Sequence, residues 1–349
     1  MTYPARARSE MDKKARIYVA GHLGLTGSAI LRRLHSENFS NLITRQRADL
    51  DLTRQGDVFT FFKDEAPDYV FLCAARVGGI LANNSYPADF IRDNLLIQTN
   101  VINAAFESGA KKLMFLSSSC AYPRNAPQPL KEEYVLSGKL EPTNEPYAVA
   151  KLAGMAMCQS YRRQYGFNAI VLMPTNLYGP GDNFDLQEAH VIAALLRKFH
   201  EAKVSRSKYV EVWGSGTPRR EFMQVDDFAD AAVFLMKNYD SHEIINVGTG
   251  VDVTVSELAT LIKEVVGYKG EVRYDASKPD GTPRKLLDVS KLNQLKWHSS
   301  IALRDGLAQT YAWYKRQVGV IARPRATAVD DRPVKSDSNR VVGGRPGAH

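Results

Sequence analysis

Strand-like and helix-like stretches alternate along residues 16–174, and this alternation limits the possible folds more than any other feature. Strands that are separated by helices usually pair in parallel, through right-handed crossovers. The pattern therefore predicts an α/β fold with a doubly wound parallel sheet. The predicted strands lie at 16–20, 41–45, 69–75, 112–117 and 168–173, and the main predicted helices at 28–36, 88–108 and 147–165.

A glycine-rich loop follows the first predicted strand. Residues 21–27 read Gly-His-Leu-Gly-Leu-Thr-Gly, a G-x-x-G-x-x-G motif that opens the first helix. Glycine permits a tight turn and a close approach of the backbone, and the first amides of a helix attract a phosphate anion. The motif predicts the diphosphate site of a Rossmann dinucleotide-binding domain, which we expect over residues 16–180.

The second predicted strand indicates which dinucleotide binds. An Asp or Glu at its end would bond the ribose 2′-hydroxyl of NAD, but the strand ends at Arg45, and Arg47 follows. Arginine attracts a 2′-phosphate instead, so we expect NADP(H). The alternative that both arginines are solvated surface residues stays open. Asp51 and Leu52 come next, where a contact with the adenine is expected.

Tyr147 and Lys151 are candidates for acid–base catalysis. They are four residues apart, and Pro146 favours a helix start, so both side chains would lie on one helix face. A free tyrosine transfers protons poorly at neutral pH, but a neighbouring lysine and an oxidised nicotinamide can lower its pKa. Ser118, beyond the strand at 112–117, could hold a substrate carbonyl oxygen beside the phenol. Taken alone, the Tyr-x-x-x-Lys spacing also occurs by chance on helix surfaces.

The alternation becomes looser beyond residue 181. A smaller C-terminal α/β part, a substrate-binding domain, is expected over 181–320. An apolar run near 243–248 is expected to return to the main sheet. The helices predicted for the smaller part lie near 190–202, 226–238 and 254–267.

The two ends of the chain differ in composition from its body. Residues 1–15 are polar and irregular, which predicts a flexible extension. Residues 321–349 are rich in Arg, Pro, Asp, Ser and Gly without periodicity, which predicts a disordered tail.

The charge distribution argues against a nucleic-acid-binding protein. The formal net charge of +8 would favour one, but residues 1–16 and 322–349 each carry +3, which leaves about +2 for the body between them. No apolar run reaches the length of a membrane span. Three cysteines are no disulfide framework and fit a reducing compartment, the cytoplasm. We expect no nucleic acid, membrane or metal ion as a partner.

Several motifs together resemble one enzyme family. With the glycine-rich loop, Ser118, Tyr147 and Lys151 in these positions, the chain resembles the extended short-chain dehydrogenase/reductases. Longer stretches narrow the resemblance to the GDP-L-fucose synthase family, over about residues 16–315. The stretches that carry this resemblance are Gly21–His22, 82–84, 87–90, 140–147, 173–180 and 275–285. The resemblance implies an NADPH-dependent epimerase/reductase that converts GDP-4-keto-6-deoxy-D-mannose to GDP-L-fucose.

The resemblance also implies roles for single residues. Cys120 would be the base and His190 the acid of two inversions, at C3 and C5, and Tyr147 would donate the proton during reduction at C4. Without the resemblance, Cys120 would be taken for packing and His190 for a structural residue. For the GDP-sugar it implies Lys198, Trp213, Arg220, Asp280 and Lys285. Motifs and resemblance together predict an NADP(H) site of Gly21, His22, Gly24, Leu25, Thr26, Gly27, Arg45, Arg47, Asp51, Leu52, Leu116, Ser117, Ser119, Lys151, Pro174, Thr175, Asn176, Leu177 and His190.

Some alternatives stay open. Leu23 stands where the family often has Arg, so the NADP preference would depend on Arg45 and Arg47. Residues 213–222 could instead be a surface hairpin. A related GDP-6-deoxyhexose epimerase/reductase or a 4-reductase is the alternative function, and a catalytically silent NADP-binding protein is a remote one. The long helices at 88–108 and 147–165, apolar on more than one face, predict a homodimer through a four-helix bundle.

Overall fold

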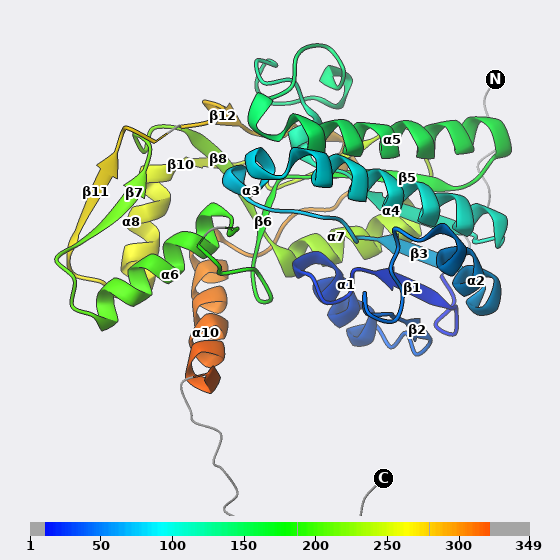
Figure 1. The fold of residues 1–349 in the computed structure, drawn as a ribbon, viewed down its shortest axis with the longest axis horizontal. Coiled ribbons are helices and arrows are strands. Elements are labelled where there is room, and N and C mark those ends of the chain that lie inside the picture. Colours follow the sequence, from blue (N-terminus) through cyan, green and yellow to red (C-terminus); the bar gives the residue numbers. More distant parts are fainter. Residues whose placement is uncertain (1–10, 187, 279, 322–349) are drawn as a thin grey trace, which may run out of the picture.

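The centre of the molecule is a six-stranded parallel sheet (Figure 1). The structure is a computed structural model that describes residues 11–186, 188–278 and 280–321. The strand order is β2-β1-β3-β4-β5-β9, and each neighbouring pair is parallel. This confirms the predicted doubly wound sheet. Its strands are β1 (Ile17–Ala20), β2 (Leu42–Ile43), β3 (Tyr69–Leu72), β4 (Lys112–Leu116), β5 (Ala169–Pro174) and β9 (Ile245–Val247).

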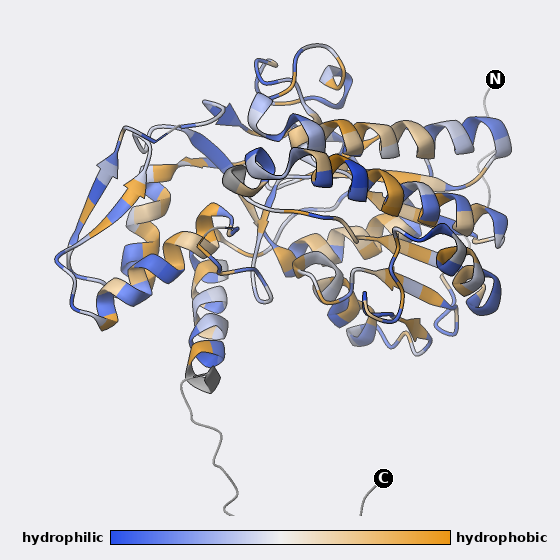
Figure 2. Ribbon diagram, viewed as in Figure 1, coloured by the Kyte–Doolittle hydropathy of each residue, from blue (hydrophilic) through white to orange (hydrophobic). Residues whose placement is uncertain are grey.

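Helices cover both faces of this sheet. One face shares a hydrophobic core with α1 and α7, and the other shares a core with α2, α4 and α5. Residues of β1, β3, β4 and β5 are buried throughout, and Figure 2 shows hydrophobic strands between the helix layers. The helices are α1 (Leu25–Ser36), α2 (Gln55–Glu65), α4 (Pro87–Glu107), α5 (Glu145–Tyr165) and α7 (Val225–Asn238).

The start of α1 differs from the prediction. The helix begins at Leu25 rather than at residue 28, so the third glycine of the motif lies inside it. A Cβ on Gly27 would lie 2.2 Å from the Gly21 carbonyl oxygen, which shows how closely the helix packs on the preceding turn. The strand predicted at 41–45 is also shorter, since β2 is a two-residue edge strand.

A smaller part with its own core lies beside the main sheet, on the left of Figure 1. In it, β7 pairs in parallel with β11, while β8 pairs with β10, β12 and β6. Because β7 and β8 belong to different sheets, the hairpin alternative for residues 213–222 is wrong. The elements are β6 (Asn176–Tyr178), α6 (Val191–Val204), β7 (Tyr209–Trp213), β8 (Arg219–Gln224), β10 (Asp252–Thr254), α8 (Val255–Val266), β11 (Glu271–Asp275), β12 (Arg284–Lys285), α9 (Ser290–Gln294) and α10 (Leu303–Ile321).

Two elements cross back from the smaller part to the main sheet. The return predicted near 243–248 is confirmed, because β9 pairs with β5. The helix predicted at 226–238 forms as α7, but it packs on α1 rather than within the smaller part. Its buried face joins the core beneath α1, and Arg32 pairs with Asp226 at 2.5 Å.

The remaining differences concern segments without a strong pattern. Met11 and Ala15 are buried in the core beside α1, so residues 11–15 do not continue the flexible extension predicted for 1–15. The stretch read as a loop before the long helix contains α3 (Ile80–Ser85). Residues 1–10 and 322–349, on which the other predictions for the ends depend, lie outside the described residues.

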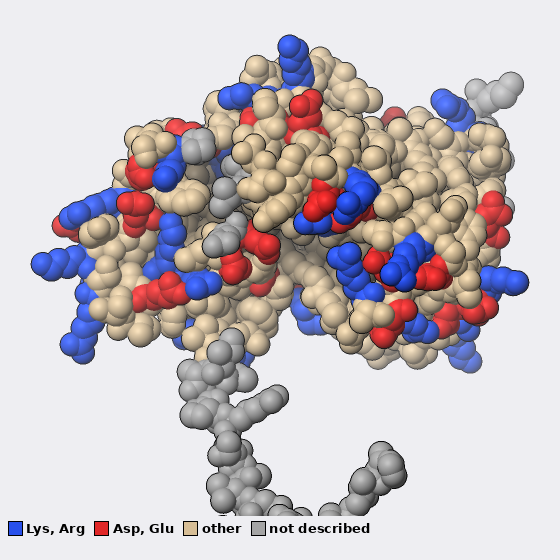
Figure 3. Space-filling view, viewed as in Figure 1, with Lys and Arg blue, Asp and Glu red and all other residues tan. Residues whose placement is uncertain are grey.

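On the face drawn in Figure 3, Lys and Arg side chains are interspersed with Asp and Glu. Among the described residues, none of the helices has the length and apolar character needed to cross a membrane.

Candidate active site

The predicted cofactor crevice lies where the strand order reverses. From β1 the chain passes to β2 on one side and then to β3 on the other, and ligands of doubly wound sheets bind at such a point. Gly21 follows β1 with φ +83°, and a Cβ there would lie 2.8 Å from the backbone nitrogen of Ala74, just beyond β3. Gly24 is the N-cap of α1. Glycine is therefore required where the loop turns at the crevice.

Two buried polar atoms near this crevice fit a dinucleotide. Nδ1 of His22 and Oγ of Ser117 have no hydrogen-bond partner within the described ranges. Buried polar atoms are normally paired, so both are available to a ligand. Their positions, in the glycine-rich loop and just beyond β4, belong to the predicted NADP(H) site.

The residues predicted to bind the adenosine end lie after β2. Arg45 pairs with Glu65, and Arg47 approaches Asp51 at 3.8 Å. The Arg47 side chain is 79% exposed and able to move toward a phosphate. The carbonyl of Leu52 accepts a hydrogen bond from Asn100 of α4, which fixes this loop against the helix. Both arginines follow β2, which is the neighbour of β1 in the sheet, and their partly exposed ion pairs contribute little to stability.

The structure brings Ser118, Tyr147 and Lys151 together. Tyr147 and Lys151 lie in the first two turns of α5, and the Lys151 Nζ is 5.7 Å from the centre of the Tyr147 ring. This Nζ donates a hydrogen bond of 2.8 Å to the carbonyl of Leu116, the last residue of β4. Ser118 is two residues further on, and its side chain lies close enough to the Tyr147 phenol to lower its pKa. The predicted acid–base group therefore forms at the end of β4.

The expected lowering of the Tyr147 pKa by Lys151 is not found. Burial raises the pKa of Tyr147, the charge of Cys120 raises it further, and the Ser118 hydrogen bond lowers it only in part. Burial also lowers the pKa of Lys151 to about 8, although Cys73 opposes this. The Lys151 ammonium donates to the Leu116 carbonyl and is not among the groups that lower the Tyr147 pKa. Tyr147 is consequently a protonated phenol at neutral pH, as a proton donor must be.

Cys120 lies next to a lysine from a distant part of the chain. The Lys285 Nζ, on β12, is 3.5 Å from the Cys120 Sγ, and the Cys120 amide donates to Ser118 Oγ at 3.2 Å. Burial raises the pKa of the Cys120 thiol, but the Lys285 charge, the Ser118 hydrogen bond and the Arg220 charge outweigh it and lower the pKa. The half-buried thiol is thus prepared to act as a thiolate base.

His190 lies at the N-cap of α6, within range of the charge of the same lysine. Although the residue is exposed, desolvation by the surrounding protein lowers the pKa of its imidazole, and the charge of Lys285 lowers it further. Lys285 therefore influences both Cys120 and His190.

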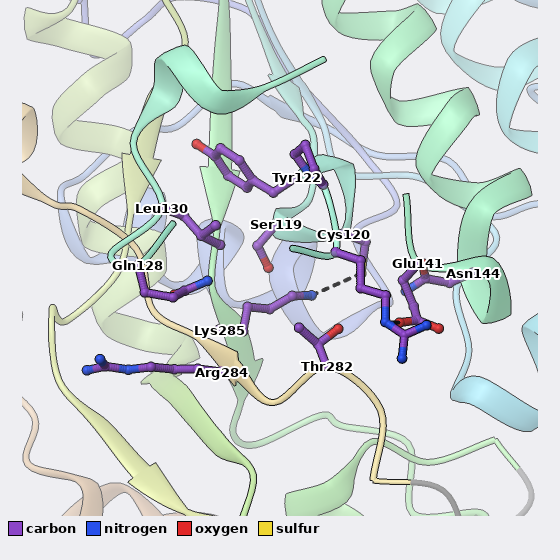
Figure 4. Close-up of a pocket in the computed structure, with 12 residues that line it drawn as sticks. Ser119, Cys120, Tyr122, Gln128, Leu130, Glu141, Asn144, Thr282, Arg284 and Lys285 are labelled. Atoms are coloured by element: carbon purple, nitrogen blue, oxygen red, sulfur yellow. Dashed lines mark hydrogen bonds and ion pairs between the residues drawn. The ribbon is translucent and has the colours of Figure 1, made fainter. Parts of the chain in front are cut away.

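A pocket opens beside Cys120 (Figure 4). Lys285 points into it toward Cys120, whereas the Arg284 side chain extends away. The pocket is bounded by the turn that carries Cys120, by the segment before α5 and by β12. Its lining residues are Ser119, Cys120, Tyr122, Pro123, Arg124, Gln128, Leu130, Glu141, Asn144, Thr282, Arg284 and Lys285.

The residues predicted for the GDP-sugar extend over the smaller part. Lys198 of α6 lies over the Trp213 ring, 5.3 Å from its centre, and the ring itself is 53% exposed. Asp280 accepts hydrogen bonds from the amide and hydroxyl of Ser215, and Arg220 donates to the Asp280 carbonyl at 3.2 Å. An exposed indole and an arginine suit a flat base and a diphosphate.

Comparisons with known proteins agree with this geometry. Residues 17–248 match the model of the NAD dependent epimerase/dehydratase family. GDP-L-fucose synthase 1 of Arabidopsis thaliana is 58% identical over 317 residues, which cover 91% of this chain and 98% of that protein. The chain belongs to the NAD dependent epimerase/dehydratase family and, within it, to the GDP-L-fucose synthases.

Other members and neighbours of the family extend the comparison. The GDP-L-fucose synthase of Escherichia coli is 54% identical over 312 residues, covering 86% of this chain and 97% of that enzyme. Among solved structures, a GDP-mannoheptose C4 reductase of Campylobacter jejuni with NADP bound has a TM-score of 0.82 and 43% identity, covering 87% of this chain and 99% of that one. The resemblance to GDP-L-fucose synthases and the predicted Rossmann fold are both confirmed.

Several residues of this GDP-L-fucose synthase site were not predicted. Tyr122, Arg124 and Gln128 line the pocket beside Cys120, and Lys278 lies 5.5 Å from the centre of the Trp213 ring. Only nearness to a motif could have indicated them, because Tyr122 follows Cys120 closely and Lys278 precedes Asp280. In the part of the chain that the structure describes, no group of three acidic, His or Cys side chains could hold a metal ion.

The loop after β5 supplies the last predicted cofactor residues. Pro174 ends β5, and Thr175 and Asn176 both donate hydrogen bonds to the carbonyl of Glu221, at 3.1 and 2.8 Å. Leu177 continues into β6. The backbone of this loop is thereby fixed to β8 of the smaller part, between the two regions of the site.

Proposed function

We propose that this chain converts GDP-4-keto-6-deoxy-D-mannose to GDP-L-fucose, by epimerisation at C3 and C5 and NADPH-dependent reduction at C4. The observation that carries the proposal is the contact between Lys285 and Cys120, 3.5 Å apart and beside Ser118 and Tyr147. A reductase needs only the tyrosine and its neighbours. A thiol with a lowered pKa in the same site supplies the base that epimerisation requires.

In the epimerisation, the Cys120 thiolate removes the proton at C3 and then the one at C5. Both carbons are next to the C4 ketone, so each removal gives an enolate whose oxygen carries the charge. The Ser118 hydroxyl and the Tyr147 phenol would donate hydrogen bonds to this oxygen. His190, on which the charge of the same Lys285 acts, would return the proton on the opposite face of the ring.

In the reduction, Tyr147 delivers the proton that converts the C4 carbonyl oxygen to a hydroxyl. The phenol is protonated because burial raises its pKa. NADPH, when bound, supplies the hydride for C4. The loop from Gly21 to Gly27, with Arg45 and Arg47, would hold the cofactor, and Lys151 keeps α5 fixed to the end of β4 through the Leu116 carbonyl.

The nucleotide part of the substrate would lie over the smaller part of the protein. Trp213 offers an exposed aromatic face for the guanine, between Lys198 and Lys278. Arg220, whose charge also reaches Cys120, would bind the diphosphate. The sugar would then extend from Arg220 toward Cys120.

The second candidate is a 4-reductase that does not epimerise its substrate. The similarity to a C4 reductase of Campylobacter jejuni favours it. A simple reductase has no use for a thiol with a lowered pKa or for a histidine beside the same lysine. We therefore prefer the epimerase/reductase, and a catalytically silent protein is disfavoured because Ser118, Tyr147 and Lys151 form an intact group.

The experiment mixes the purified protein with NADPH and GDP-4-keto-6-deoxy-D-mannose, follows the absorbance of NADPH and identifies the product by NMR. The wild type should give GDP-L-fucose. Cys120→Ser should oxidise NADPH but give a product that keeps the D-manno configuration. Cys158→Ala, which changes a buried cysteine on α5, is the matched control and should behave as the wild type. A wild-type product without inversion at C3 and C5 would replace this proposal with the 4-reductase.

We also propose that the chain forms a homodimer through α4 and α5. Val149 of α5 and Leu96 of α4 are 38% and 40% exposed, and Ala153 and Ala156 continue an exposed small apolar stripe along α5. Two copies of such a helix pair would bury these stripes in a four-helix bundle.

A reducing compartment such as the cytoplasm would keep the Cys120 thiol unoxidised.

A further inference from the structure

Asn246 is a buried asparagine in β9 whose side-chain oxygen and nitrogen are both paired. Its side-chain nitrogen donates to the carbonyls of Leu130 and Asp288, at 2.9 and 3.0 Å. Its side-chain oxygen accepts a hydrogen bond of 2.6 Å from the Tyr122 hydroxyl, and its backbone N–H donates to the Glu132 carboxylate at 3.1 Å. A carboxamide that is satisfied on both sides has one stable orientation.

The partners of Asn246 belong to two segments of the active site. Tyr122 comes two residues after Cys120, and Asp288 comes three residues after Lys285. Leu130, in the first segment, exchanges backbone hydrogen bonds with the second, where its amide donates to Leu286 and its carbonyl accepts from Asp288. The Asn246 carboxamide is therefore placed where the two segments meet.

Tyr122 can only donate in this arrangement. It is 3% exposed, and burial together with the charge of Glu132 raises its pKa, so the phenol keeps its proton. Its hydroxyl donates to the side-chain oxygen of Asn246, which leaves the side-chain nitrogen for the carbonyls of Leu130 and Asp288.

We propose that Asn246, acting through Tyr122, is a positioning residue for epimerisation: it aligns the Cys120 segment with the Lys285 segment and so sets the distance between thiol and ammonium. The effect on epimerisation rests on the proposed function, whereas the effect on the distance between thiol and ammonium does not. The attraction between two charges weakens as their separation grows, so a small shift of either segment reduces the effect of Lys285 on the thiol. Reduction at C4 uses Tyr147 on α5, and the side-chain hydrogen bonds of Asn246 to described residues go to Tyr122, Leu130 and Asp288 instead.

A purely structural role for Asn246 would have a different result. In that case a change at Asn246 or Tyr122 would lower the stability of the protein and leave the acidity of the thiol unchanged in the folded molecules. The charged groups that act on Cys120 are Lys285 and Arg220, and Tyr147 lies beside it. A shift in the titration of Cys120 therefore reports on their geometry.

The test measures the alkylation rate of Cys120 by iodoacetamide as a function of pH, with peptide mass mapping to separate it from Cys73 and Cys158. Tyr122→Phe removes one hydroxyl, and Asn246→Ala is the second variant. Both should raise the apparent pKa of Cys120 by half a unit or more, which lowers the alkylation rate at neutral pH about threefold. Tyr239→Phe, which removes another buried tyrosine hydroxyl, is the matched control.

A second readout connects the pair to catalysis. Deuterium uptake from solvent at C3 and C5 of GDP-4-keto-6-deoxy-D-mannose should fall about threefold in Tyr122→Phe, in step with the loss of thiolate, while NADPH binding stays as in the wild type. Identical alkylation profiles in Tyr122→Phe, Asn246→Ala and Tyr239→Phe would overturn the inference. The alkylation measurement needs no substrate, so it decides the positioning role even when the wild type takes up no deuterium, a result that would instead reject the proposed function.

Discussion

The ammonium of Lys285 lies 3.5 Å from the sulfur of Cys120, although 165 residues separate them in the chain. The contact joins the smaller part of the molecule, through β12, to the turn that follows β4 of the main sheet. It gives a thiol that is surrounded by protein a pKa below its ordinary value. The epimerase half of the proposed reaction thus depends on how the two parts pack together.

Replacing Lys285 by Met should raise the pKa of Cys120. Lys285 lowers this pKa by its charge and by a hydrogen bond, so its loss moves the alkylation profile of Cys120 to higher pH. We expect a shift of about one unit and about tenfold slower deuterium uptake at C3 and C5 at neutral pH. Lys291→Met, which changes a lysine paired with Glu243 instead, is the control. An unchanged profile would show that Lys285 does not activate the thiol.

Replacing Tyr147 by Phe should separate reduction from epimerisation. The variant loses the proton donor to the C4 oxygen, so NADPH oxidation should slow by about 10²–10⁴-fold. Deuterium uptake at C3 and C5 should fall much less, because Cys120 and Lys285 are unchanged and Ser118 still donates a hydrogen bond to the enolate oxygen. The control is Tyr161→Phe, which removes a hydroxyl that bonds to Asn103 on α4. Equal losses in both half-reactions would contradict separate roles.

The reduction rate also has an expected pH dependence. Burial and the Cys120 charge raise the pKa of Tyr147, so the phenol remains protonated well above neutral pH. Its deprotonation should therefore cause no loss of NADPH oxidation between about pH 7 and pH 9. A steep fall within this range that disappears in Tyr147→Phe would show that the phenol titrates lower than the structure indicates.

Replacing Arg45 and Arg47 by Ala should weaken NADPH binding and spare NADH. Only NADPH carries the 2′-phosphate that the two guanidinium groups would bind, and charged hydrogen bonds of this kind correspond to about 10–100-fold in affinity. Fluorescence titration with both cofactors measures the difference. Arg273→Ala, on the exposed strand β11, is the control. If both cofactors lose affinity equally, the arginines stabilise the loop rather than select the phosphate.

The homodimer should dissociate when charge is placed on its proposed interface. Leu96→Glu combined with Val149→Glu introduces carboxylates into the apolar stripes of α4 and α5, and burying them would be costly. Sedimentation at micromolar concentration should change from dimer to monomer. Val204→Glu, at an exposed position that ends α6, should leave the dimer intact. A monomeric wild type would end the proposal.

The features that the sequence predicted correctly are local in the chain. The parallel sheet followed from the alternation of strands and helices, and the glycine-rich turn from residues 21–27. The pairing of Tyr147 with Lys151 needed only a helix with four residues between them, and Pro146 marked where it begins. Neighbours in the chain determine such features, because backbone periodicity places them on one face whatever the rest of the molecule does.

Only the tertiary structure decided the features that depend on distant segments. The docking of α7 on α1 instead of on the smaller part follows from which core accepts its apolar face, and the Tyr147 pKa follows from burial that no local pattern reveals. The approach of Lys285 to Cys120, and the place of Asn246 between their segments, require β8, β9 and β12 to pack together first. The physical reason is that burial and electrostatic interactions act through space, whereas sequence patterns record only neighbours along the chain.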